Sequence, residues 1–177
     1  MNAIPRKAGL ALLAVGMLAS VSGCALDSRA DGESAVEEPV RTVGLAKVDP
    51  CTMLTEQELA ARGGRPPGYP NNDIAAEPGC DFDGDPFGYS FYKNQEMTVE
   101  RYGERDVWSR FERSELDGRP AAITVVRGSA SARICSTMFD AGGGVITVTA
   151  QETDDEGRDE CAESWQVAEL IAAKSPR

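Results

Sequence analysis

A chain of 177 residues with a formal net charge of −11 and no histidine excludes several classes of function. Without histidine it lacks the commonest general base and the commonest metal ligand near neutral pH, which rules out Ser-His and Cys-His nucleophiles and H-E-x-x-H zinc sites. Phosphates repel an acidic surface, so we expect no nucleic acid among its partners.

The amino-terminal residues follow the pattern of a secretory signal peptide. Arg6 and Lys7 supply the positive charge, and residues 8–21 form an apolar stretch that is shorter than the roughly 20 residues of a membrane-spanning helix. Small residues follow and end at Cys24. We therefore predict a signal peptide over residues 1–23.

The stretch V-S-G-C at residues 21–24 resembles a bacterial lipobox. The resemblance implies that the Cys24 thiol carries a diacylglyceryl group and that the peptide bond before it is cut. Two acyl chains, such as palmitate, give stable membrane anchoring. We therefore expect a lipoprotein on the extracytoplasmic face of the cell membrane. The alternative is an ordinary signal peptide, with Cys24 free or paired.

The residues after Cys24 suggest a tether that leads into one domain. Residues 24–47 contain no aromatic residue and few apolar ones, so we expect them to be disordered. Residues 48–177 are long enough for a single globular domain with its own core.

The first element of this domain is a short helix. Thr55 and Glu58 have the spacing of a capping box, and Leu54 and Leu59 that of a hydrophobic staple, while the glycines that follow end the helix. Residues 64–73 are rich in Pro, Gly and Asn, which indicates a loop.

Strand patterns follow the loop. Phe87, Tyr89 and Phe91 alternate with small or polar residues within residues 87–94, which gives one apolar face that is typical of core. The adjoining residues 95–108 fit either a helix or an irregular crossing.

Two hairpins are predicted further along. The Asp-Gly pair at 117–118 separates residues 110–116 from residues 120–126, and Pro120 indicates an edge strand. Glycines join residues 132–140 to residues 144–151.

The chain ends on a predicted helix. Cys161, Trp165, Ala168 and Ala172 fall on one helical stripe, flanked by Val167 and Ile171. Together these patterns predict an α+β fold, in which an antiparallel sheet of about five strands packs against an early short helix and a carboxyl-terminal helix.

Four cysteines remain besides Cys24, and an exported protein is expected to pair them. Of the three possible pairings we favour Cys51 with Cys80 and Cys135 with Cys161, because each bridge then ties a helix to the nearest strand in sequence. A metal or redox site is the alternative, but the chain has no C-x-x-C motif.

The stretch D-P-C-T-M-L-T-E-Q-E at residues 49–58 resembles the opening of an actinobacterial secreted lipoprotein family, domain of unknown function 3558. Gly79-Cys80, the D-G-R-P-A turn at 117–121 and a late cysteine before a terminal helix fit the same family, over about residues 48–174. Phe82 stands where the resemblance implies an aromatic residue that is often Trp. The family carries no established activity, so no site residue follows from it.

Acidic clusters are the remaining chemical candidates. Asp81, Asp83 and Asp85 alternate like calcium ligands, but position 6 of the loop pattern is Pro86 and position 12 is Tyr92, so we predict no metal site. The acidic run at 151–161 fits a solvated loop before a helix, although it could dock a basic partner.

The absence of catalytic residue types, together with the export and anchoring signals, predicts a non-catalytic envelope lipoprotein. We expect it to need no cofactor and to bind an envelope protein or a small envelope ligand. A carboxylate-dependent hydrolase of envelope polymers is one alternative, and it requires two converging acids, one with a raised pKa. An accessory or structural subunit of a membrane complex is the other, and it requires an exposed apolar patch.

Overall fold

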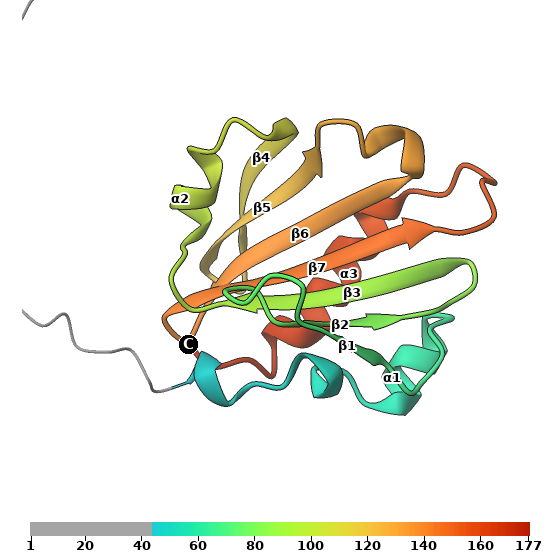
Figure 1. The fold of residues 1–177 in the computed structure, drawn as a ribbon, viewed down its shortest axis with the longest axis horizontal. Helices are drawn as coiled ribbons and strands as arrows, with labels where there is room; N and C mark the ends of the chain where they lie inside the picture. The colour runs from blue at the N-terminus through green and yellow to red at the C-terminus, as the bar shows by residue number, and fades with distance from the viewer. Residues whose placement is uncertain (1–43) are drawn as a thin grey trace, which may run out of the picture. The chain divides into compact units, whose positions relative to one another are not determined.

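The computed structural model describes residues 44–177, and in this part of the chain seven strands form one antiparallel sheet in the order β1-β2-β3-β7-β6-β5-β4 (Figure 1). The strands are β1 (Tyr69–Asn71), β2 (Gly79–Phe82), β3 (Phe87–Asn94), β4 (Trp108–Leu116), β5 (Arg119–Val126), β6 (Ile134–Ala141) and β7 (Gly144–Glu152). The helices are α1 (Glu56–Ala61), α2 (Val99–Gly103) and α3 (Glu160–Ala172), with 3₁₀ turns at Leu45–Lys47, Pro50–Thr52 and Ala130–Ala132. The α+β class is confirmed, but the sheet has seven strands and not about five.

The first additional strand lies in the segment that was predicted to be a loop. Tyr69 to Asn71 pair with Asp81 to Gly79, which makes β1 one edge of the sheet. Pro70 makes this segment look like a loop in the sequence, because proline is rare in strands. It is tolerated here because one side of an edge strand needs no ladder hydrogen bonds. Its partner β2 is only four residues long and gives too short an alternation to be assigned with assurance.

Both predicted hairpins are present. Asp117 and Gly118 connect β4 to β5 with φ values of 52° and 70°, as a two-residue type I′ turn requires. Gly142 and Gly143 connect β6 to β7 with φ values of 52° and 90°.

Pro120 does not mark an edge strand, which corrects the prediction. β5 lies between β4 and β6, and β4 is the edge. Pairing between β5 and β6 begins only at Ala121, opposite Phe139. Pro120 is therefore accommodated as an early residue of an inner strand, before the second ladder needs its N–H group.

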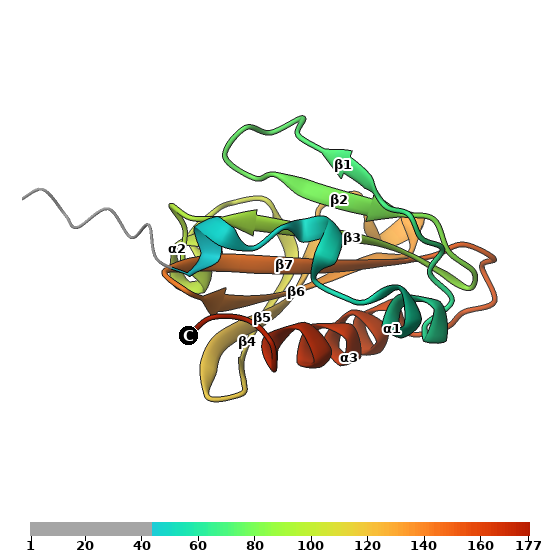
Figure 2. The ribbon, with the colours of Figure 1, turned by 90° about the horizontal axis from the view of Figure 1, so that it is seen from below.

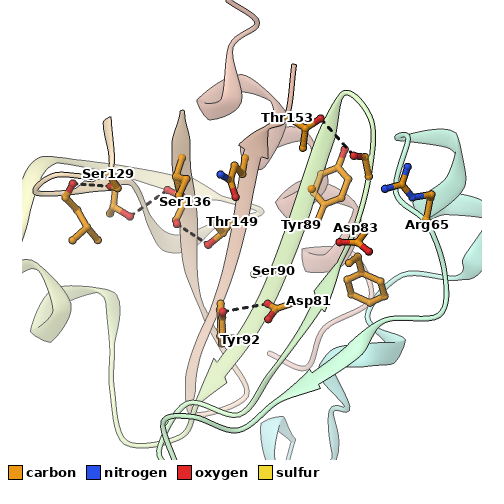
Figure 3. A pocket seen from close by; sticks show the side chains of 17 residues that line it. Arg65, Asp81, Asp83, Tyr89, Ser90, Tyr92, Ser129, Ser136, Thr149 and Thr153 are labelled. Atoms are coloured by element: carbon orange, nitrogen blue, oxygen red, sulfur yellow. Dashed lines mark hydrogen bonds between the residues drawn. The ribbon is translucent and has the colours of Figure 1, made fainter. Parts of the chain in front are cut away.

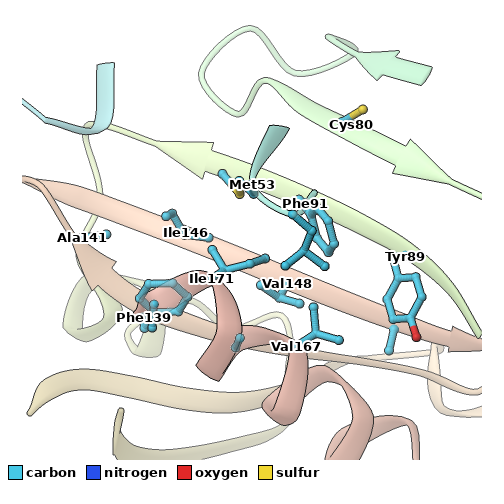
Figure 4. Packing of buried hydrophobic residues seen from close by; sticks show 14 of the residues in the cluster. Met53, Cys80, Tyr89, Phe91, Phe139, Ala141, Ile146, Val148, Val167 and Ile171 are labelled. Atoms are coloured by element: carbon cyan, nitrogen blue, oxygen red, sulfur yellow. The ribbon is translucent and has the colours of Figure 1, made fainter. Parts of the chain in front are cut away.

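The main core lies between the sheet and α3. Figure 2 shows α3 and α1 together on one face of the sheet. Phe91, Phe139, Ile146 and Val148 point from the strands toward Val167 and Ile171 of α3, and all are buried (Figure 4). The predicted stripe of Phe87, Tyr89 and Phe91 belongs to this core.

The buried face of α3 differs slightly from the predicted stripe. Its buried residues are Ser164, Val167, Ala168, Ile171 and Ala172, whereas Trp165 is only partly buried. The Ser164 hydroxyl lies 2.9 Å from the buried Thr137 hydroxyl, so a polar pair that the periodicity does not reveal sits inside the contact with β6.

The α1 helix forms as its caps predict. The Thr55 hydroxyl accepts from the Glu58 N–H, and the Glu58 carboxylate accepts from the Thr55 N–H at 2.8 Å. Leu54 and Leu59 are both buried. Gly63, with a φ of 82°, follows the helix end.

The domain begins earlier than predicted. Leu45 is 1% exposed and belongs to the core, and its N–H donates to the Gly142 carbonyl in the β6–β7 turn at 3.5 Å. The predicted tether over residues 24–47 is therefore too long at its carboxyl end, because Leu45 near that end is buried in the core. Cys24 and the predicted signal peptide lie outside the described residues.

Two disulfides join the elements as expected. Cys51 bonds Cys80 of β2 with an S–S distance of 2.04 Å, and Cys135 of β6 bonds Cys161 of α3 at 2.02 Å. Among residues 44–177, no helix has the length and apolar content needed to cross a bilayer.

The ambiguous residues 95–108 contain the short helix α2, whose N-cap is Thr98. It packs on the face of the sheet opposite α3, where Met97, Val99 and Tyr102 contact Ala122, Met138 and Val145 in a second, smaller core. This helix covers only the part of that face near the β6–β7 turn, and the rest carries the candidate site.

Candidate functional site

The face of the sheet opposite α3 carries a row of hydroxyl side chains. Ser90 of β3 pairs with Thr149 of β7, Thr149 with Ser136 of β6, and Ser136 with Thr124 of β5. Because residues opposite each other in neighbouring strands point to the same face, these four side chains lie side by side. We call Ser90, Thr149, Ser136 and Thr124 the hydroxyl row.

The row continues to both edges of the sheet. Asp81 of β2 is opposite Ser90, and Tyr69 of β1 is opposite Asp81. At the other end Phe111 of β4 is opposite Thr124. An acid and two aromatic residues therefore flank the four hydroxyl groups.

A groove lies over the hydroxyl row (Figure 3). It has a volume of about 700 Å³, and a second cavity of about 380 Å³ adjoins it and shares Tyr92, Thr124, Val126, Ser136 and Thr149. We call the two together the open-face groove. Cavities of this size are typical of small-ligand sites.

Hydrogen bonds fix the floor of the groove. The Ser136 and Thr149 hydroxyls lie 2.7 Å apart, and the Thr124 hydroxyl donates to the Ser136 carbonyl at 3.3 Å. Ser90, Ser136 and Thr149 remain partly exposed, so their oxygens are accessible to a ligand.

A polar cluster forms one wall. The Asp81 carboxylate accepts from the Asn71 amide at 2.8 Å and from the Tyr92 hydroxyl at 3.3 Å. Burial, and then the Asp81 charge, raise the pKa of Tyr92, so its phenol keeps its proton at neutral pH and remains a donor.

The second cavity has an aromatic wall built around Glu77. This carboxylate accepts from the Tyr102 hydroxyl at 2.5 Å and from the Asn94 amide at 3.1 Å. The Trp108 indole N–H donates to the Tyr102 carbonyl at 2.7 Å. Burial raises the pKa of Tyr102, and the bond to Glu77 raises it further, so this phenol stays protonated as well.

Exposed apolar side chains gather around the same face. The large hydrophobic residues that are most exposed within residues 44–177 are Tyr69 (59%), Ile74 (59%), Val126 (46%) and Val107 (42%). Ile74 and Val126 line the groove, Tyr69 ends the row, and Val107 accepts a backbone bond from Arg127, next to Val126. Exposed apolar groups of this kind mark interaction sites when they cluster.

The charged side chains that line the groove are mostly acidic. Its lining includes four acidic residues, Asp73, Glu77, Asp81 and Asp83, but one basic residue, Arg65. The groove therefore disfavours anions.

The structure does not bring the three alternating aspartates into a metal site. Asp81 bonds Asn71 and Tyr92, Asp83 lines the groove, and Asp85 is an exposed residue of the β2–β3 turn. Among the described residues there is no group of three Asp, Glu, Cys or His side chains that could hold a metal ion.

The acidic run at 151–161 includes one buried residue. The Glu152 side chain is fully buried and accepts from Arg133 Nε at 2.8 Å and from the Arg158 N–H at 2.7 Å. Burial opposes its ionisation, but these bonds outweigh burial and lower its pKa. Part of the acidic run therefore stabilises the loop before α3 through the hydrogen bonds of Glu152.

One carboxyl group of the described residues has a raised pKa, and it lies away from the open-face groove. Asp140 accepts from the Val99 N–H at 2.8 Å, and burial raises its pKa. It lines a separate cavity of about 240 Å³ beside the β6–β7 turn. Its hydrogen bond holds the start of α2.

Most of the groove is not evident from the sequence. Asp81 and Asp83, singled out above as a calcium-like pattern, and Tyr89 of the core stripe do line the main cavity. The hydroxyl row went unnoticed, although each of Ser90, Ser136 and Thr149 alternates with buried residues along its strand. Alternating serines and threonines on adjacent strands are the signal that could have found it.

The comparisons with known proteins give a family and no activity. The family model described as "Protein of unknown function (DUF3558)" matches residues 19–174, so the match begins before the predicted acylation site and not at residue 48. No curated protein and no solved structure matches the chain. The chain belongs to the DUF3558 family of proteins of unknown function.

Proposed function

We propose that this protein is a lipid-anchored extracytoplasmic binding domain without catalytic activity, and that its open-face groove holds the ligand. The observation that carries the proposal is the groove itself: about 700 Å³ over a hydrogen-bonded hydroxyl row, on the face opposite the core. The ligand would be a small envelope molecule or a segment of an envelope protein.

The side chains at the groove support binding over catalysis. The carboxylates Asp81 and Glu77 are each held by neutral donors, and the carboxyl group with a raised pKa is Asp140, in a different cavity. A carboxylate-dependent hydrolase needs a proton-donating acid beside its second acid.

The anchoring part of the proposal rests on the V-S-G-C stretch and on the start of the family match at residue 19, which includes it. Mass spectrometry of the amino-terminal peptide from cells tests it. We expect a diacylated Cys24 at the first position, and a Cys24→Ser variant that leaves the membrane fraction. An unmodified amino terminus on a protein that remains exported would contradict the anchor.

The binding part is tested by photocrosslinking in cells with the full chain. A crosslinking side chain at Ser136, on the groove floor, is compared with one at exposed Ala162 on α3. We expect a discrete adduct from position 136 and none from position 162. Equal or absent labelling at both positions contradicts the groove as the binding site, and turnover of envelope glycans, esters or peptides by the purified protein contradicts a non-catalytic role.

A further inference from the structure

We infer that the groove binds an uncharged polyhydroxylated ligand of the saccharide class, which lies along the hydroxyl row across the strands. The inference rests on the proposed function and names the ligand class for the same site.

The hydroxyl row matches a ligand that is itself a series of hydroxyl groups. A serine or threonine hydroxyl donates one hydrogen bond and accepts two, and a sugar hydroxyl does the same, so either partner can take either role. Neighbouring strands lie about 4.8 Å apart, so Ser90, Thr149 and Ser136 offer one such group at each of three regular steps. Thr124, at the end of the row, is buried and its hydroxyl is bonded within the floor. A small ligand with a single polar group would leave most of these steps without a partner.

The end of the row at β2 provides a strong acceptor beside neutral donors. Asp81 accepts from Asn71 and Tyr92, yet a carboxylate has about four acceptor positions, so two remain for ligand hydroxyls. Hydrogen bonds to an ionised carboxylate are about twice as strong as those between neutral groups. The Tyr92 phenol gives its only hydrogen to Asp81, and its oxygen adds an acceptor at the same point.

Aromatic rings lie in the adjoining cavity, where the carbon–hydrogen faces of a sugar ring need an apolar surface. Tyr92, Tyr102 and Trp108 line it, and the rings of Tyr102 and Trp108 meet edge to face with centroids 6.4 Å apart. Each ring combines an apolar body with a polar tip, and all three tips are already hydrogen-bonded within the protein.

Charge excludes anionic ligands and favours a neutral one. The main cavity is lined by two acidic residues, Asp81 and Asp83, and one basic residue, Arg65. Its net charge is therefore negative, so it repels phosphates and carboxylates. At Glu77 a cation would have to displace existing bonds, because this carboxylate is engaged by Tyr102 and Asn94, with Arg105 4.0 Å away.

The position of the groove also argues against an extended peptide. A peptide that adds to a sheet pairs its backbone with an edge strand. The row lies on the face of inner strands, where the backbone groups of β3, β7, β6 and β5 are already paired with one another. What the protein presents there is side-chain hydroxyl groups.

Amide chemical-shift titration of the exported Cys24→Ser chain tests the inference. The probes are glucose, galactose, mannose, arabinose, N-acetylglucosamine, maltotetraose and cellotetraose, with spermidine and a neutral extended peptide as comparisons. We expect at least one saccharide to shift residues of the hydroxyl row, with an affinity that does not change between low and high salt.

Substitutions in the row sharpen the test. The affinity for the responding saccharide should fall about three- to tenfold, as expected for the loss of one hydrogen bond, in each of the variants Ser90→Ala, Ser136→Ala and Thr149→Val. Asp81→Asn should weaken it at least as much. Ser114→Ala removes an exposed hydroxyl group from β4 outside the groove and should leave affinity unchanged. Unchanged melting temperatures establish that each variant is folded.

The outcomes separate the ligand class from the groove. If spermidine or the peptide shifts the amide signals of the hydroxyl row and no saccharide does, the saccharide inference is wrong, but the groove remains the proposed binding site. If shifts from a saccharide fall outside the row, the inference is likewise overturned. If no probe shifts the row and position 136 crosslinks nothing in cells, both proposals are wrong.

Discussion

The ammonium group of Lys174, just after α3, lies 2.7 Å from the carboxylate of Glu58 in α1. The same carboxylate accepts from the Thr55 N–H and hydroxyl. Lys174 first, and then the bonds from Thr55, lower the pKa of Glu58 from 4.5 to about 2. One side chain thus closes the α1 cap and ties both helices together.

This relationship predicts an acid-dependent stability. Folding favours the ionised form of Glu58, so its contribution is complete above pH 4.5 and is lost as the pH falls toward 2. Since the side chain is about one-third exposed, we expect a contribution of about 1 kcal/mol. Urea unfolding against pH should show that Glu58→Gln removes this amount at neutral pH and only a small part of it at pH 2. Glu56→Gln, in the same helical turn, is the control and should have a smaller effect at neutral pH.

The two disulfides should contribute similar amounts to the free energy of unfolding. Cys51–Cys80 and Cys135–Cys161 span sequence separations of 29 and 26 residues, for which the loop-closure argument gives about 3 to 4 kcal/mol each. Urea unfolding of the Cys51→Ser/Cys80→Ser and Cys135→Ser/Cys161→Ser variants measures this, and each pair is the control for the other. Thiol titration of the unfolded Cys24→Ser protein should find no free thiol among the four, and a free thiol would contradict the pairing.

Arg119 should be important for the position of α3. It is 7% exposed, its Nη2 donates to the Ala172 carbonyl at 2.6 Å, and its guanidinium lies 5.1 Å from the centre of the Phe139 ring. We expect Arg119→Ala to lower the free energy of unfolding by about 2 to 4 kcal/mol, because it leaves a cavity and an unpaired carbonyl. Arg119→Met should cost less because it keeps the packing.

The matched control for Arg119 is Arg113, an exposed residue of β4 with its guanidinium 5.4 Å from the Phe111 ring centre. Arg113→Ala should change stability by less than about 1 kcal/mol. Equal effects of the two alanine substitutions in chemical unfolding would contradict the role of Arg119.

Gly84 is predicted to tolerate no side chain. A Cβ atom there would lie 1.8 Å from the Phe87 carbonyl oxygen, and this backbone atom belongs to β3 and cannot move aside. We expect Gly84→Ala to cost about 3 kcal/mol or more. At Gly88 the nearest atom would be 3.5 Å away, so Gly88→Ala should change stability by less than about 1 kcal/mol. Thermal unfolding of the two variants gives the comparison, and equal melting temperatures would be the contrary result.

The predictable parts of this protein were those with local causes. The α1 cap needs only Thr55 and Glu58, and the β4–β5 turn needs only Asp117 and Gly118. Both follow from a few adjacent residues. The disulfide pairing was also found, because each cysteine joins the nearest complementary element in sequence.

The groove could not be derived in the same way. Ser90 and Thr124 belong to one row only because β7 and β6 are inserted between β3 and β5 in a particular register. A shift of one residue would turn Thr149 toward the core and Val148 toward the groove. Such a row depends on the pairing of distant strands, and periodicity within one strand shows only that these residues face away from the core.

The contact between Leu45 and the β6–β7 turn has a mechanical consequence. Leu45 meets Gly142 beside the start of β7, whereas Gln151, seven residues beyond Gly144, lines the groove near the end of the strand. At about 3.4 Å per residue these two points of β7 lie about 24 Å apart. Tension applied through the residues before Gly44 would therefore load the glycine turn first, away from the Gln151 end of the groove. For the anchored binding domain proposed above, a pull on the tether would thus reach the turn before the hydroxyl row.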